Sequence, residues 1–188
     1  MKCARCKKKE CYEGKECVKI KEEILPLYEK PELFKITEVA TFLEGKYYMQ
    51  LTRLEEIIRF AKLMGYRKIG IAFCIGFSYE ARVLEEILEK HFEVSSVCCK
   101  VCGIDKKRFH LEQIRKDIYE AMCNPLGQAG ILNREKTDLN IILGLCVGHD
   151  ILFTKYSKAP VTTFAVKDRV LAHNTLGAIY SGYYRKKF

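Results

Sequence analysis

The stretch I-I-L-G-L-C-V-G-H-D, from Ile141 to Asp150, decides the fold of this chain. Its apolar run predicts a buried strand of a parallel sheet, because helices cover both faces of such sheets. The cysteine, the glycine and the final aspartate predict a turn into a helix that Asp150 caps. Ligands bind beyond the carboxyl ends of parallel strands, so this strand-to-helix corner is a candidate binding site.

A second stretch, Ile69 to Ser78, repeats the pattern as I-G-I-A-F-C-I-G-F-S and ends in a serine that is expected to cap a helix. Cys74 and Gly76 stand where the first stretch has Cys146 and Gly148. Glycine lets the backbone approach a ligand, and the positive end of a helix lowers the pKa of a nearby thiol. Each cysteine alone is typical of a buried core residue, but the matched pair favours two ligand-binding corners.

Strands and helices alternate along residues 65–188. This alternation predicts a mostly parallel sheet of about four strands with helices on both faces, a three-layer α/β/α sandwich. The expected strands are Ile69–Phe73, Val94–Lys100, Asn140–Leu145 and Val161–Val166, and the expected helices include one that begins at Ser78, Phe109–Met122, one capped by Asn124 with Pro125 following, and Leu176–Tyr183.

The chain before this core divides into two parts. Residues 1–30 are a cysteine-rich segment that we expect to bind metal, and residues 31–188 form the α/β domain. Within that domain, residues 31–64 have helical periodicity and are a long helical lead-in that Gly45 divides. Residues 65–188 are the parallel-sheet core.

The N-terminal cysteines follow the spacing C-x2-C-x4-C-x5-C, and the segment has almost no apolar residue from which to build a core. Such a segment would hardly fold without an ion. A tetrahedral zinc site accepts four thiolates on short loops, and zinc is favoured here. A [4Fe-4S] cluster also takes four cysteines, and a tail with free thiols is the remaining alternative. The expected ligands are Cys3, Cys6, Cys11 and Cys17.

The expected second strand ends in C-C-K-V-C-G, which contains half of a metal knuckle. Cys99 and Cys102 supply two thiols, and the remaining ligands must come from elsewhere in the chain. Candidates are Cys3 and Cys6, or the two corner cysteines, or Cys123, which precedes an expected helix start. The predicted core site holds either zinc or an iron–sulfur cluster. Its candidate ligands are Cys74, Cys99, Cys102, Cys123 and Cys146, with Gly76 and Gly148 in close approach to the bound group.

Polar residues lie beside these cysteines in the sequence and are the catalytic or positioning candidates. His149 lies in the corner that contains Cys146, and K-D-R-V-L-A-H-N follows the last expected strand. In an all-parallel sheet these residues reach the same edge, where they would orient a small-molecule substrate. The alternative is structural: Asp168 and Arg169 form a salt bridge within the loop, and His173 is a capping group. The candidates are His149, Asp168, Arg169 and His173.

Composition restricts the class of protein. No apolar run reaches the ~20 residues that a membrane-spanning helix needs, and the N-terminus lacks the apolar region of a signal peptide. We therefore expect a cytoplasmic protein whose ten cysteines are thiols rather than disulfides. The formal charge of +9 is spread among glutamates except in three short clusters, which argues against a nucleic-acid partner.

Three motifs together carry a resemblance: G-L-C-V-G-H-D at Gly144–Asp150, K-D-R-V-L-A-H-N at Lys167–Asn174, and the N-terminal C-A-R-C. With them the chain resembles an uncharacterised prokaryotic family, domain of unknown function 1847, that is described as predicted metal-binding. The resemblance implies a metal site, with the N-terminal and strand-end cysteines at the matching positions. It implies no reaction.

Three functional hypotheses follow. The first is a cysteine-rich protein with an iron–sulfur cluster or zinc at the strand ends and a second ion at the N-terminus, in a redox, sulfur-transfer or metal-carrier role. The second is a zinc-stapled module that binds nucleic acid or protein. The third is a metal-free thiol enzyme in which Cys146 is the nucleophile and His149 its base.

Overall fold

The computed structural model describes residues 1–188, and the chain divides into two units, 1–49 and 50–188. The first unit contains two 3-10 turns, Cys3–Arg5 and Glu10–Glu13, and the helices α1 (Lys21–Tyr28) and α2 (Pro31–Lys46). Gly45 lies inside α2, so the helical region is interrupted just after it rather than at it. The boundary between the units falls inside the segment that we expected as a helical lead-in.

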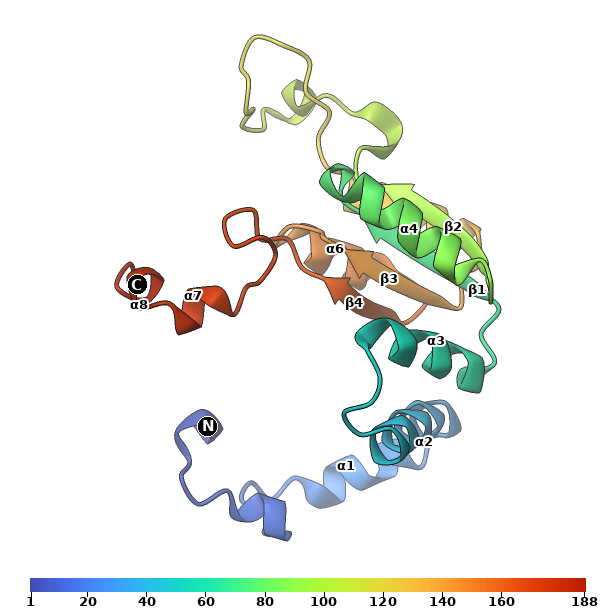
Figure 1. The fold of residues 1–188 in the computed structure, drawn as a ribbon, viewed down its shortest axis with the longest axis vertical. Helices are drawn as coiled ribbons and strands as arrows, with labels where there is room; N and C mark the ends of the chain where they lie inside the picture. The colour runs from blue at the N-terminus through green and yellow to red at the C-terminus, as the bar shows by residue number, and fades with distance from the viewer. The chain divides into compact units, whose positions relative to one another are not determined.

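The second unit is built on a four-stranded sheet in which every neighbouring pair is parallel, in the order β2-β1-β3-β4 (Figure 1). The sheet confirms the predicted architecture. β3 is buried at all five positions, as its unbroken apolar run predicts. The strands are β1 (Lys68–Phe73), β2 (Glu93–Cys98), β3 (Leu139–Leu143) and β4 (Val161–Ala165).

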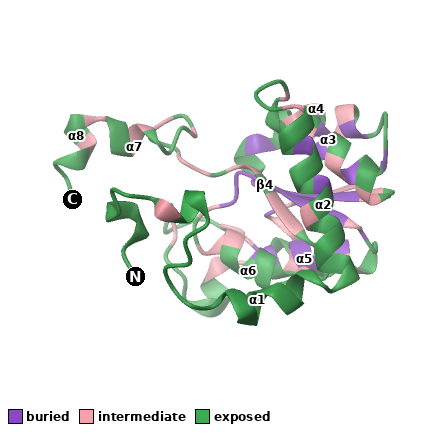
Figure 2. Cartoon of the chain, turned by 90° about the horizontal axis from the view of Figure 1, so that it is seen from below, coloured by how far each residue is buried: buried purple, intermediate pink, exposed green.

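Helices cover both faces of this sheet. Figure 2 shows α3 (Arg53–Met64) and α4 (Ser78–Leu88) on one face, and α5 (Pro125–Arg134) and α6 (His149–Tyr156) on the other. The core lies between these layers and includes Leu88 of α4, Leu132 of α5 and Phe153 of α6, all fully buried. The unit is therefore the three-layer α/β/α sandwich that the sequence predicts.

The two strand-to-helix corners lie side by side at the carboxyl edge of the sheet. β1 and β3 are neighbours, and the N–H of Cys74 donates to the carbonyl of Leu143 at 3.1 Å. From these neighbouring strands the chain leaves in opposite directions, into α4 on one face and into α6 on the other. This arrangement is a topological switch point, and it opens a crevice between the two corners.

The predicted helix Phe109–Met122 is wrong. Residues 104–121 form an irregular excursion that contains only the 3-10 turn Lys106–Phe109 and is closed at its base by a bridge between Asp105 and Ala121. The apolar side chains of the segment have no sheet face to cover, because α5 already packs against β1 and β2. An isolated helix of this length is marginal in water.

The helix starts differ in part from prediction. Asn124 caps α5 as expected, because its Oδ1 accepts from the N–H of Gly127 at 2.8 Å and Pro125 follows it. Ser78 and Asp150 do not cap α4 and α6, since each lies within the first turn of its helix. The backbone makes both turns instead, through a 3-10 turn at Ile75–Phe77 and through positive φ at Gly148.

The C-terminal helix predicted over Leu176–Tyr183 is two short helices, α7 (Gly177–Tyr180) and α8 (Gly182–Arg185). Ser181 separates them in an extended conformation. No helix in the chain has both the length and the apolar character to cross a bilayer.

Gly144 lies where the two corners pack against each other, and its substitution tests the fold. Its φ is +71°, and a Cβ there would overlap the ring of Phe77, which belongs to the other corner. Left-handed strain and overpacking together predict that Gly144→Ala lowers the free energy of unfolding by about 2–4 kcal/mol. Denaturant unfolding measures this loss.

The matched control is Gly130→Ala in α5. Nothing lies within 4 Å of the added Cβ, so this substitution should raise helix stability by about 0.5–1 kcal/mol. Equal unfolding midpoints for the two variants would show that the two corners are not packed as described.

Candidate functional site

A pocket of about 670 Å³ lies at the carboxyl edge of the sheet, within the second unit. Its floor comes from the two corners, from Lys100 just beyond β2 and from the loop after β4. Its roof comes from the excursion at residues 104–121. Cys74, Cys123, Cys146 and His149 line it together with Arg169. The pocket therefore gathers thiols from three separate segments of the chain.

Cys99 lies beneath these lining residues and is only 2% exposed. The N–H of Ile75, in the corner after β1, donates to its Sγ at 3.3 Å. Hydrogen bonding to Cys123 and burial raise the pKa of Cys99 well above its usual range. Cys99 is therefore one member of a hydrogen-bonded pair of thiols, and its environment disfavours ionisation.

Cys123 is the other member, at the end of the excursion. Hydrogen bonds with Cys99 and with His149 lower its pKa well below the usual range, and the positive charge of Lys100 adds to this effect. Burial acts in the opposite direction but is the smaller influence. The environment of Cys123 therefore favours ionisation, and the side chain of His149 acts on Cys123 rather than on Cys146.

Cys146 has a different partner. The Nη2 of Arg169 lies 3.2 Å from its Sγ, and this interaction raises the pKa of the guanidinium. Arg169 comes from the loop after β4, so the parallel sheet brings the two motifs together as predicted. Arg169 therefore places a positive charge directly beside this sulfur.

Asp168 and His173 are near the pocket but do not line it. The Oδ1 of Asp168 accepts from the N–H groups of Val170 and Leu171, and its own N–H donates to Nδ1 of His173. The His173 ring lies against Phe77, with ring centroids 4.4 Å apart. These two residues therefore shape the loop that presents Arg169.

Gly76 and Gly148 contribute through the backbone rather than through contact with the pocket. A Cβ at Gly76 would lie 2.9 Å from Nζ of Lys167, whose ammonium stands over the Phe77 ring. Gly148 has a φ of +87° and open space around it. Neither glycine lines the pocket.

The remaining predicted ligands lie elsewhere. Cys102 is exposed at a backbone position with φ of +71° and does not line the pocket. The four N-terminal cysteines are exposed in the first unit, and all ten cysteines are free thiols. Nowhere in the chain do three or more Cys, His, Asp or Glu side chains already stand as a set that could hold a metal ion.

Several residues of the site were not predicted. Lys100 lines the pocket and donates to the carbonyl of Ala121 at 2.6 Å, which ties the floor to the excursion. Gln128 of α5 is fully buried and donates to the carbonyls of Phe73 and Val97, so it fixes the ends of β1 and β2. A glutamine on the apolar face of a helix was the signal in the sequence.

Comparison with known proteins adds a family but no activity. A model of the family described as Protein of unknown function (DUF1847) matches residues 12–164, which contain both corners but end before Arg169. The chain is 65% identical over 188 residues to Uncharacterized protein MJ0455 of Methanocaldococcus jannaschii, with 100% of this chain and 97% of that relative covered. No solved structure matches the chain.

The lowered pKa of Cys123 predicts an unusual pH dependence of alkylation in metal-free protein. Because the folded pKa lies below the usual thiol value, the thiolate persists as the pH falls below that value and is lost only near the lowered pKa. Iodoacetamide, followed by peptide mapping, should therefore label Cys123 under mildly acidic conditions. His149→Gln should move the labelling midpoint to higher pH.

The control is His91→Gln, which removes a histidine whose Nδ1 lies 3.1 Å from Nζ of Lys62 and which is not a pocket residue. This substitution should leave the pH profile of Cys123 alkylation unchanged. Identical profiles for Cys123 in the folded protein and in denaturant would contradict the described pair.

Proposed function

The chain belongs to the DUF1847 family, and from its residues we propose that it binds a thiophilic metal, as zinc or an iron–sulfur cluster, at the carboxyl edge of its sheet. The proposed ligands are Cys74, Cys99, Cys123 and Cys146. The observation that carries this proposal is the convergence of four thiols from four separate segments on one switch-point pocket.

The chemistry of this donor set supports the proposal. Zinc and iron–sulfur clusters are both held by four cysteine thiolates, whereas oxygen ligands suit magnesium and calcium. The only carboxylate that lines the pocket, Glu120, is paired with Lys106 at 2.7 Å. Sulfur is therefore the donor that the pocket offers.

The charges around the sulfurs support the proposal as well. A site with four thiolates is anionic, and it needs cations or N–H groups nearby. Arg169 contacts Cys146, Lys100 acts on Cys123, and the N–H of Ile75 donates to Cys99. Each of these three sulfurs thus has a positive or N–H partner of its own.

The donor types fit such a group, although no three of them stand as a coordination set, so binding requires rotation of side chains. A bound ion or cluster would supply Lewis-acid or redox chemistry. His149, which contacts Cys123, and Arg169, which contacts Cys146, would then orient a ligand beside it.

For the N-terminal segment we keep the proposal of a second ion, with zinc favoured. Its two 3-10 turns have no buried residue, so no core holds them. Backbone N–H groups of Lys9 and Lys8 lower the pKa of Cys6, as they do around the sulfurs of a metal knuckle. The ligands would be Cys3, Cys6, Cys11 and Cys17.

A metal-free thiol enzyme is the second candidate function. The sequence hypothesis paired Cys146 with His149, whereas the hydrogen bond of His149 goes to Cys123. In this alternative Cys123 is the nucleophile and His149 is its base, with Arg169 available to bind a negative substrate group. Activity in the metal-free protein would favour this alternative.

Metal analysis with matched variants tests the main proposal. Protein purified without oxygen should contain zinc, or iron with acid-labile sulfide, and Cys74→Ala or Cys146→Ala should remove the metal of the core site. Cys3→Ala should remove only the N-terminal ion. Element analysis and the visible spectrum measure both.

Cys98→Ala is the control. Cys98 ends β2 beside Cys99 but does not line the pocket, so its removal should leave the metal content unchanged. Full metal content in the Cys74 and Cys146 variants would refute the core site while leaving the N-terminal one standing.

A further inference from the structure

The pocket is much larger than is needed for the sulfur cluster formed by the four pocket cysteines. Its volume of about 670 Å³ falls within the range of about 300–1,000 Å³ that is typical of small-molecule sites. The sulfurs occupy the floor at the strand ends, whereas the excursion borders the open space above them. The structure therefore leaves room for an organic ligand beside whatever the cysteines hold.

The charges of the residues that line the pocket indicate which charge that ligand would carry. Four cations line the pocket against the single carboxylate of Glu120, and Lys106 already neutralises that carboxylate. Lys100 and Arg169 face sulfurs. The guanidinium of Arg115 has neither a hydrogen-bond nor an ion-pair partner, so one positive charge stays uncompensated even if the sulfurs nearby are ionised.

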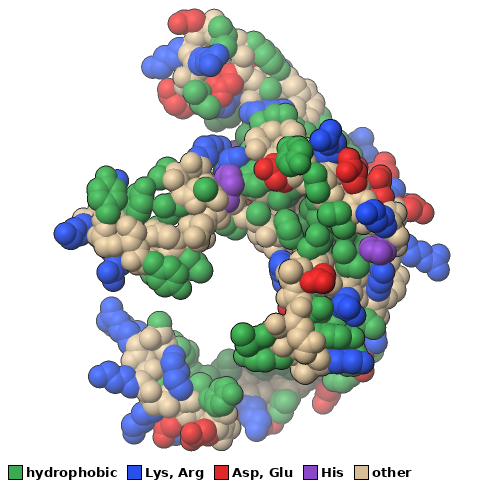
Figure 3. Space-filling view, viewed as in Figure 1, with side chains coloured by type: hydrophobic (Ala, Val, Ile, Leu, Met, Phe, Trp, Pro, Cys, Tyr) green, Lys and Arg blue, Asp and Glu red, His purple; other side chains and the backbone are tan.

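The roof is apolar on either side of Arg115. Leu111, Ile114 and Ile118 line the pocket from the excursion, and they are 44%, 87% and 51% exposed. Figure 3 shows hydrophobic side chains next to Lys and Arg on this part of the chain, at the top of the view. Large apolar side chains exposed around a pocket are typical of a ligand site.

We propose that this pocket binds a small organic anion, a carboxylate on a short apolar chain, with the carboxylate at Arg115 and the chain against Leu111, Ile114 and Ile118. A planar guanidinium matches a carboxylate with two parallel hydrogen bonds. The inference deepens the proposed function, and it rests on that function only in assigning the sulfur end of the pocket to a metal. The ligand would lie between that end and the excursion.

The test uses hexanoate with two matched probes, hexan-1-ol and hexylamine, on the full chain purified without oxygen. Titration calorimetry or ligand-observed NMR should detect hexanoate but neither neutral nor cationic probe. Arg115→Gln should weaken hexanoate binding about tenfold, as loss of charged hydrogen bonds predicts. Ile114→Ser should reduce the preference for hexanoate over acetate.

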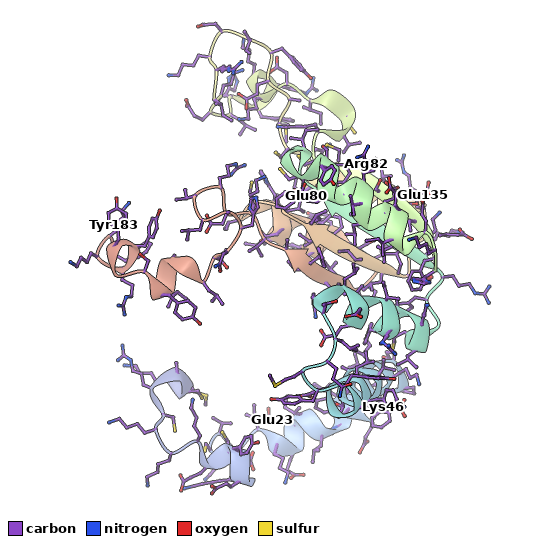
Figure 4. All side chains as sticks on the ribbon, in the orientation of Figure 1. Glu23, Lys46, Glu80, Arg82, Glu135 and Tyr183 are labelled. Atoms are coloured by element: carbon purple, nitrogen blue, oxygen red, sulfur yellow. The ribbon has the colours of Figure 1, made fainter.

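The control variant is Arg82→Gln on α4, labelled in Figure 4, whose guanidinium lies near Glu86 and the Tyr79 ring and not in the pocket. It should bind hexanoate as the wild type does. The inference is overturned if hexan-1-ol binds as well as hexanoate, if Arg115→Gln changes nothing, or if acetate binds as tightly as hexanoate.

Metal content measured on the same samples separates this inference from the proposed function. Selective hexanoate binding by protein that contains no core metal would refute the proposed metal site but not the organic-anion site. If the core metal is present but hexanoate does not bind, the organic-anion site is refuted and the proposed metal site is not. Arg115→Gln should keep its metal, because Arg115 contacts none of the sulfurs.

Discussion

The site depends on one constraint: after two neighbouring strands, the chain continues to opposite faces of the sheet. β1 turns into α4 on one face and β3 turns into α6 on the other, while the Cys74–Leu143 backbone hydrogen bond keeps the corners together. Gly144 permits the close approach, since the Phe77 ring occupies the space of its missing side chain. Without this divergence there would be no crevice for Cys74 and Cys146 to line.

The pocket follows from electrostatics as much as from topology. Two neighbouring thiols, Cys99 and Cys123, share a hydrogen bond that raises the pKa of Cys99 and lowers the pKa of Cys123. Arg169 provides a positive partner for a third sulfur, and Lys100 ties the excursion to the floor through the carbonyl of Ala121. Sulfur donors, balancing cations and an organic-sized space thus occur together, as expected of a metal site that also binds a ligand.

The sequence predicted the parts of the fold that strong local patterns determine. The continuous apolar runs predicted β1 and β3, and the matching corners predicted that Cys74 and Cys146 would lie together. The helix that periodicity predicted over residues 109–122 is absent. Periodicity records which residues are apolar, but it does not show whether a face of the sheet remains for them to cover. Consequently the roof of the pocket, including Arg115, was missed, and so was the pairing of His149 with Cys123, because spatial neighbours cannot be deduced from spacing.

The most direct test of the central claim is X-ray absorption spectroscopy at the metal edge of protein purified without oxygen. The analysis should use a variant that lacks the N-terminal cysteines, so that only the core site contributes. We expect a shell of sulfur scatterers at about 2.3 Å from zinc or iron, supplied by the cysteines of the pocket. The absence of any metal edge, or a first shell of oxygen and nitrogen without sulfur, would contradict the account.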